Sequence, residues 1–238
     1  MEIYAKGIES RQLNEIIRSC KDDKIVIRGV NGQRFIACGL DKKDVTAVGT
    51  IGNGAGAYMQ GGVLRVEGSA QDATGDTMNG GEIYVGGRCG DAAGYAMRGG
   101  GIFIKGDVGY RAGVHMKQYG EHKPVIVVGG TAGCFLGEYL AGGVIVVLNT
   151  ENKENPVGED MARGMHGGRI YVRGKVTVPL PVSVTARKAG SEDMLFIKPY
   201  LESFCVAFGG SIKELTSDEF TLILPAAGNP YKRLYVHN

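Results

Sequence analysis

Short runs in which every second residue is aliphatic recur along the middle of the chain. In each run of four residues the second and fourth are aliphatic, so both side chains lie on one face of an extended strand. The pattern predicts six strands with one buried face, at residues 63–66, 82–85, 101–104, 125–128, 144–147 and 169–172. The inward pairs would be Leu64/Val66, Ile83/Val85, Ile102/Ile104, Ile126/Val128, Ile145/Val147 and Ile170/Val172.

A repeat bounded by glycine carries these strands. Methionine followed by a polar residue and Gly-Gly recurs every 19 residues at Met59, Met78 and Met97. Three further markers, Met116, Leu140 and Met165, continue the repeat with insertions at residues 118–122 and 150–155. Insertions in a repeat protein form surface loops, commonly where partners bind.

The length of the repeat limits the fold. A unit of 19 residues leaves no room for the helix that a βαβ crossover needs. We therefore expect an all-β protein, a right-handed parallel β-helix of about seven 19-residue coils with short α-helical terminal caps. The expected domains are an N-terminal helix and strand cap at 1–29, the glycine-repeat β-helix at 30–178, and a C-terminal capping segment with one helix at 179–238. Helical spacing of apolar residues supports helices at 10–20 and 201–208.

A second apolar stripe lies on the outward face of the predicted strands. The third residue of successive strands is Tyr84, Phe103, Val127, Val146 and Tyr171. Because proteins seldom leave so large an apolar patch in contact with water, we expect a cover. Two covers fit the sequence, the terminal helices of the chain itself or a partner protein. We take the stripe as a candidate partner-facing surface.

Composition narrows the class of protein. Of 238 residues 40 are glycine, 27 are basic and 25 acidic, and 43% are hydrophobic, which argues against disorder and against a nucleic-acid footprint. Eighteen consecutive apolar residues occur nowhere, and residues 1–15 lack the apolar core of an export signal. Five cysteines form no CxxC pair. We expect a cytoplasmic protein with reduced thiols and no membrane segment.

The residue types that could carry chemistry have simpler structural interpretations. Residues 52–57 match a relaxed dinucleotide fingerprint, but no helix pattern follows them. His115 and His122 flank the first insertion without a third placed metal ligand. Asp72 and Asp91 lie one repeat apart, either as paired carboxylates or, more simply, as turn caps that accept backbone N–H groups. The sequence assigns no catalytic, cofactor-binding or metal-binding residue.

The repeats together with the run Gly129-Gly130-Thr131-Ala132-Gly133-Cys134-Phe135-Leu136-Gly137-Glu138-Tyr139 resemble a known family. The chain is similar to the C-terminal glycine-repeat (GXGXG) domain of the glutamate synthase large subunit, in its stand-alone form. The resemblance extends to residues 31–36 upstream and 230–235 near the end. The repeat alone also resembles the β-helix component of formylmethanofuran dehydrogenase.

The resemblance implies a scaffold with no catalytic activity of its own inside an oxidoreductase of nitrogen metabolism. Glutamate synthase releases ammonia from glutamine in an amidotransferase domain and uses it to aminate 2-oxoglutarate reductively in a domain that carries FMN and an iron-sulfur cluster. The expected partners are therefore the amidotransferase and FMN-binding synthase polypeptides, with self-association possible, and the cofactors lie in the partners. The amidotransferase nucleophile is an N-terminal cysteine, whereas Glu2 follows Met1 here. An independent enzyme using Asp72 and Asp91, and a module that binds a small ligand, are the alternatives.

Overall fold

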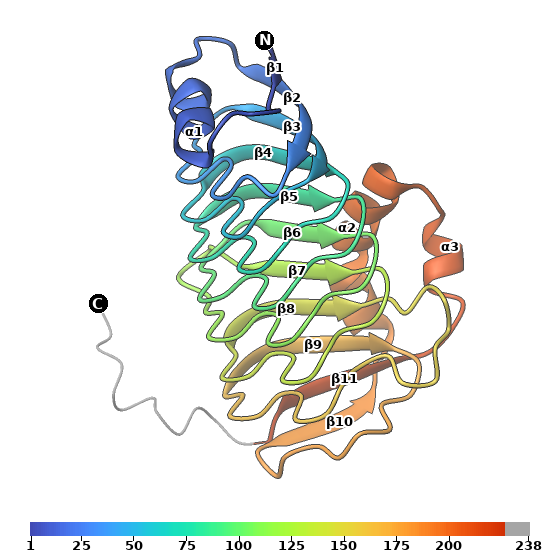
Figure 1. The fold of residues 1–238 in the computed structure, drawn as a ribbon. Coiled ribbons are helices and arrows are strands. Elements are labelled where there is room, and N and C mark those ends of the chain that lie inside the picture. Colours follow the sequence, from blue (N-terminus) through green and yellow to red (C-terminus); the bar gives the residue numbers. More distant parts are fainter. Residues whose placement is uncertain (227–238) are drawn as a thin grey trace.

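The structure is a computed structural model that describes residues 1–226; the family-like run at 230–235 lies outside this range. Eleven strands form one sheet, in the order β1-β2-β3-β4-β5-β6-β7-β8-β9-β11-β10 (Figure 1). The elements are β1 (Glu2–Tyr4), α1 (Ser10–Ser19), β2 (Lys24–Asn31), β3 (Asp44–Thr50), β4 (Gln60–Glu67), β5 (Gly80–Val85), β6 (Gly101–Ile104), β7 (Val125–Val128), β8 (Ala141–Val147), β9 (Gly167–Arg173), β10 (Val184–Lys188), α2 (Ser191–Phe208), α3 (Ile212–Leu215) and β11 (Phe220–Pro225).

The six strands predicted from the alternating pattern are confirmed as parts of β4 to β9. Successive strands pair in parallel with equivalent repeat positions opposite each other, so Ile83 lies beside Ile102 and Ile102 beside Ile126. Every predicted inward pair is buried in one continuous core. Period-2 alternation was sufficient here because the second and fourth side chains of every strand enter the same core, which fixes the register.

The predicted fold class, an all-β right-handed parallel β-helix, is wrong. The described residues form a single mixed sheet with few helices, not a solenoid of coils. Strands β1 to β9 are parallel neighbours, but β11 pairs antiparallel with both β9 and β10. Between the strands each repeat contributes only a turn-rich segment and one isolated bridge to its neighbour, such as Ile51 to Ala70.

Backbone geometry explains why the rest of each repeat does not form further strands. In the segment that precedes β5, Ala73, Gly75 and Thr77 all have positive φ, from 50° to 71°. A residue with left-handed φ interrupts an extended strand. The N–H groups of Ala73 and Thr77 donate instead to the carbonyls of Asp91 and Tyr95 in the next repeat, at 2.8 Å each.

The two ends of the stacked repeats are covered in different ways. At the first end α1 buries Leu13 and Ile17 in the core. At the other end Val176, Val178 and Leu180 pack against the same core. The C-terminal helix expected as a terminal cap is α2, and it instead lies along the outer face of the sheet (Figure 1). Across residues 1–226, no helix combines the length and apolar character needed to cross a membrane.

The start of α2 is held by an ion pair to the neighbouring edge strand. The Asp193 carboxylate accepts hydrogen bonds from Arg187 Nη1 at 2.6 Å and Nη2 at 3.1 Å, and from the Gly190 N–H at 2.8 Å. The hydrogen bond from Arg187 is the largest of the effects that hold the pKa of Asp193 below its ordinary value. The acid also lies in the first turn of the helix, where negative charge is favoured.

We expect Asp193→Asn to destabilise the protein in a way that depends on pH. Because the folded-state pKa is lowered, the carboxylate contributes stability above its unfolded pKa of about 3.9, and that contribution is lost as pH falls through the folded value. Urea unfolding at several pH values should show a constant deficit for the variant from pH 5 to 8, shrinking below about pH 4. Glu192→Gln, at an exposed neighbouring position, is the control. A deficit independent of pH would contradict the ion-pair assignment.

Candidate functional site

The predicted partner-facing stripe is buried within the chain itself. Tyr84, Phe103, Val127, Val146 and Tyr171 lie opposite one another on β5 to β9, and none is more than 9% exposed. Helix α2 covers them with residues that include Ile197, Leu201 and Phe204. Of the two covers that the sequence allowed, the structure has the chain's own helix over this stripe.

Aromatic contacts hold the end of α2 against the stripe. The rings of Tyr84 and Phe103 stack with centroids 5.0 Å apart, and Phe208 meets Tyr84 edge-on at 6.3 Å. Burial, reinforced by the hydrogen bond from Tyr84 Oη to Glu82 at 2.9 Å, raises the pKa of Tyr84 to about 12. Tyr84 is therefore neutral at physiological pH and serves as part of the packing.

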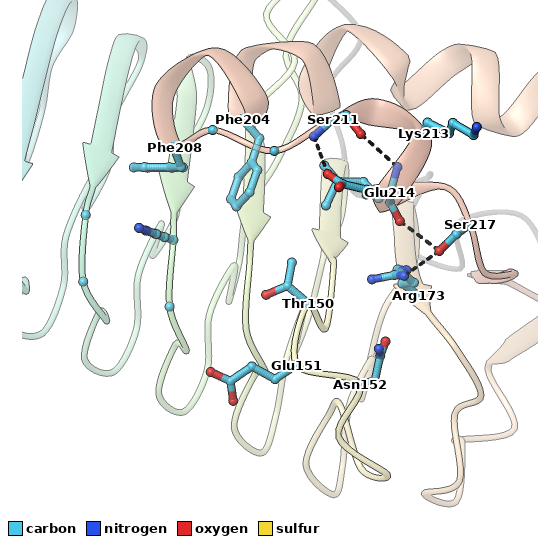
Figure 2. Close-up of a pocket in the computed structure, with 17 residues that line it drawn as sticks. Thr150, Glu151, Asn152, Arg173, Phe204, Phe208, Ser211, Lys213, Glu214 and Ser217 are labelled. Atoms are coloured by element: carbon cyan, nitrogen blue, oxygen red, sulfur yellow. Dashed lines mark hydrogen bonds between the residues drawn. The ribbon is translucent and has the colours of Figure 1, made fainter.

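A groove opens where the end of α2 and the following α3 lean over the sheet. Its volume is about 1020 Å³. Figure 2 shows the Phe204 ring reaching from the helix toward Thr150, while Lys213 points away from the other labelled side chains. Residues 150–152 of the second insertion form part of the wall, and the repeat corners Gly86, Gly87 and Gly106 also line the groove.

Arg173, the last residue of β9, lines this groove and is only 7% exposed. Its Nη2 donates to Ser217 Oγ at 2.9 Å and to the Asp218 carboxylate (Figure 2). Its Nε is buried and has no hydrogen-bond partner among the described residues. A buried donor without a partner typically costs about 1–3 kcal/mol, so the position is unusual in a folded protein.

The aspartates of successive repeats are structural caps. The Asp72 carboxylate accepts the N–H of Asp91 at 2.9 Å, and Asp91 accepts the N–H of Tyr110 at 2.8 Å. Asp107 accepts both the N–H and the hydroxyl of Thr131, at 2.7 and 2.9 Å. Burial raises the pKa of Asp107, but these bonds and the Lys153 charge outweigh burial and leave the pKa lowered. Asp72 and Asp91 accept backbone N–H groups, as the turn-cap interpretation predicted, but the prediction of a local cap is wrong because each acid binds the next repeat.

Exposed rings line the turn segments on a different side of the repeats. We call Tyr58, Tyr95, His115 and Tyr139 the aromatic row; its tyrosines are 54%, 42% and 41% exposed. His115 stacks on Tyr139 with centroids 5.1 Å apart and meets Tyr95 edge-on at 6.0 Å. The N–H groups of His115 and Tyr139 donate to the following repeat at 3.0 and 2.8 Å. Tyr95, His115 and Tyr139 are therefore a preorganised part of this exposed row.

The remaining candidate residues do not form a site. Within the described part of the chain, no group of three His, Cys, Asp or Glu side chains could hold a metal ion. The first insertion folds back on itself through paired backbone hydrogen bonds between Tyr119 and His122. Burial raises the pKa of the Cys89 thiol to about 11, so this thiol is protonated at neutral pH. Residues 52–57 form a turn, as the structural interpretation of their glycines required.

The GXGXG motif family matches residues 24–225, from the start of β2 to the end of β11. The chain belongs to the GXGXG motif family. It is also 46% identical over 248 residues to the uncharacterized protein MJ1350 of Methanocaldococcus jannaschii, in a match that covers 98% of this chain and 95% of that protein. In this GXGXG motif protein, the matched range contains the stripe, the aromatic row and every residue that lines the groove.

Sequence reasoning missed the aromatic row and the groove. The aromatic row had a visible signal, since Tyr58, His115 and Tyr139 each directly precede the Met or Leu marker of a repeat. The groove had a weaker one, because Arg173 occupies the outward position two residues after Tyr171 at the end of the strand. Neither sequence feature predicts that α2 and α3 form the helical wall of the groove.

Proposed function

We propose that this GXGXG motif protein is a noncatalytic scaffold subunit of a split glutamate synthase. The observation that carries the proposal is the aromatic row, an exposed set of rings on stacked repeats. Aromatic residues and arginine are enriched at protein interfaces and dominate their binding energy. Arg111 lies beside the row, ion-paired to Glu138 at 3.1 Å and over the Phe135 ring at 4.8 Å.

The proposed role is to hold two active sites in a fixed arrangement. Ammonia released by the amidotransferase polypeptide must reach the synthase polypeptide before it diffuses away. A rigid subunit that binds both raises their effective concentration and fixes their orientation. FMN and the iron-sulfur cluster belong to the partners, and this chain contributes geometry. The family membership and the resemblance in the repeats support this assignment over an independent enzyme.

The test is reconstitution with separately purified amidotransferase and FMN-binding synthase polypeptides from the same organism. We expect a complex that carries flavin absorbance and forms glutamate from glutamine and 2-oxoglutarate faster than the two polypeptides without this chain. A chain that binds neither polypeptide would overturn the proposal. Copurification with a pterin-containing enzyme would favour the formylmethanofuran dehydrogenase relationship instead.

We expect the double variant Tyr95→Ser, Tyr139→Ser to weaken this complex about tenfold or more, because exposed aromatic anchors carry much of an interface's energy. Biolayer interferometry against each partner measures the change. The matched control is Tyr4→Ser, a tyrosine that is 67% exposed on β1, far from the row. Equal affinities of the double variant and the control would place the interface elsewhere on the protein.

A further inference from the structure

The groove beneath the end of α2 combines an apolar wall with a cationic one. Phe204, Phe208 and Leu215 line it from the helical side, while Lys105 and Arg173 line it from the sheet. Its volume of about 1020 Å³ is at the upper end of the range for small-molecule sites. Such a lining suits a molecule that has an apolar body and a charged group.

Arg173 is the residue that points to the charge of that molecule. Both of its hydrogen bonds leave from Nη2, and Nε has no partner among the described residues. Because the two hydrogens of Nη2 are taken by Ser217 and Asp218, one oxygen of a carboxylate or phosphate would accept a single charge-assisted hydrogen bond from Nε. Because Nε is covered, a bound oxygen would reach it through a small shift of the side chain.

Two acidic residues, Glu151 and Glu214, also line the groove. Glu151 is ion-paired with Lys153 at 3.1 Å, and the Glu214 carboxylate accepts the Ser211 N–H at 2.9 Å. Asp218, the partner of Arg173, is 54% exposed, so water screens its charge. Lys105 has no ion pair among the described residues. Lys105 therefore remains available to an anion in the groove, and Arg173 keeps its unpartnered Nε.

Main chain from three glycines forms part of the groove lining. Gly86, Gly87 and Gly106 come from the corners of two neighbouring repeats. A Cβ at Gly87 or Gly106 would lie 2.9 or 3.0 Å from a carbonyl oxygen of the preceding repeat, so the stacking of the repeats accounts for these glycines. Thr150 and Asn152 add a hydroxyl and an amide from the second insertion.

We propose that this groove binds a small organic anion. Its carboxylate or phosphate group would meet Arg173 and Lys105, and its apolar part would lie against Phe204 and Phe208. The site is separate from the aromatic row, so the inference goes beyond the scaffold function and stands or falls independently of it.

The test is a titration of the full chain with benzoate, phenyl phosphate, inorganic phosphate and the uncharged benzamide. The readout is the NMR signal of the Arg173 Nε–H, assigned by its loss in Arg173→Gln, together with calorimetry. We expect saturable shifts with benzoate for a carboxylate site or with phenyl phosphate for a phosphate site. Inorganic phosphate alone should bind at least fivefold more weakly, because it has no apolar part.

Arg173→Gln also removes the hydrogen bonds to Ser217 and Asp218. Two lysine variants therefore test the charge of the groove without disturbing those bonds. Lys105→Gln removes a cation from the groove and should weaken binding of the anion at least threefold. Lys123→Gln, an exposed lysine near the first insertion, makes the same charge change elsewhere and should leave binding unchanged. The proposal is overturned if no anion shifts the Arg173 signal, if benzamide binds as well as benzoate, or if both lysine variants behave alike.

Discussion

Gly81→Ala should destabilise the protein by about 2–5 kcal/mol, a large part of the stability of an ordinary domain. Gly81 has φ +83°, which is costly for any residue with a Cβ. A Cβ at this position would also lie 2.7 Å from the carbonyl carbon and oxygen of Gly61 and from the carbonyl oxygen of Gly62. Those atoms are backbone of the preceding repeat and cannot rotate away. Urea unfolding measures the loss.

Gly32→Ala is the matched control for this result. Gly32 has nearly the same φ, +81°, but a Cβ there would meet nothing within 4 Å. We therefore expect a loss of about 1–2 kcal/mol, the conformational cost alone. The difference between the two variants isolates the close contact between repeats. Equal losses would show that left-handed geometry, and not stacking, requires glycine at Gly81.

The second large effect is expected from Leu201→Ala, which removes a fully buried side chain between α2 and the sheet. Truncation of a buried leucine typically costs about 2–5 kcal/mol. Hydrogen exchange should also rise over β5 to β9 in this variant, because α2 is the cover of the stripe that begins at Tyr84 and ends at Tyr171. Thermal and urea unfolding give the stability change.

Leu195→Ala is the comparison, because Leu195 lies on the same helix but is 69% exposed. A surface truncation of this kind is expected to change stability by no more than about 0.5 kcal/mol. Similar losses in the two variants would mean that α2 contributes little through its buried face. A large loss confined to Leu201→Ala would show that packing on the sheet holds the helix.

Only part of the candidate site could be predicted from the sequence. The sequence indicated the apolar stripe correctly as a surface that needs a cover, since alternation places Phe103 and Val127 on one face. It could not choose between α2 and a partner, because that choice depends on how residues 191–208 pack against strands of which the first lies more than a hundred residues earlier. The groove beside Arg173 exists only because the helix lies there.

What the sequence determined by itself is the set of repeated strands, their buried faces and their register. The strands and their buried faces follow from alternation over four residues, and the register follows from the 19-residue spacing of the repeats. Only the tertiary structure decided the sheet, with its antiparallel strands β10 and β11, and the form of the turn segments. Ala73 and Thr77 adopt left-handed conformations that their own preferences oppose, because carbonyls of the next repeat accept their N–H groups. These hydrogen bonds form between repeats, so the sequence of a single repeat does not predict them.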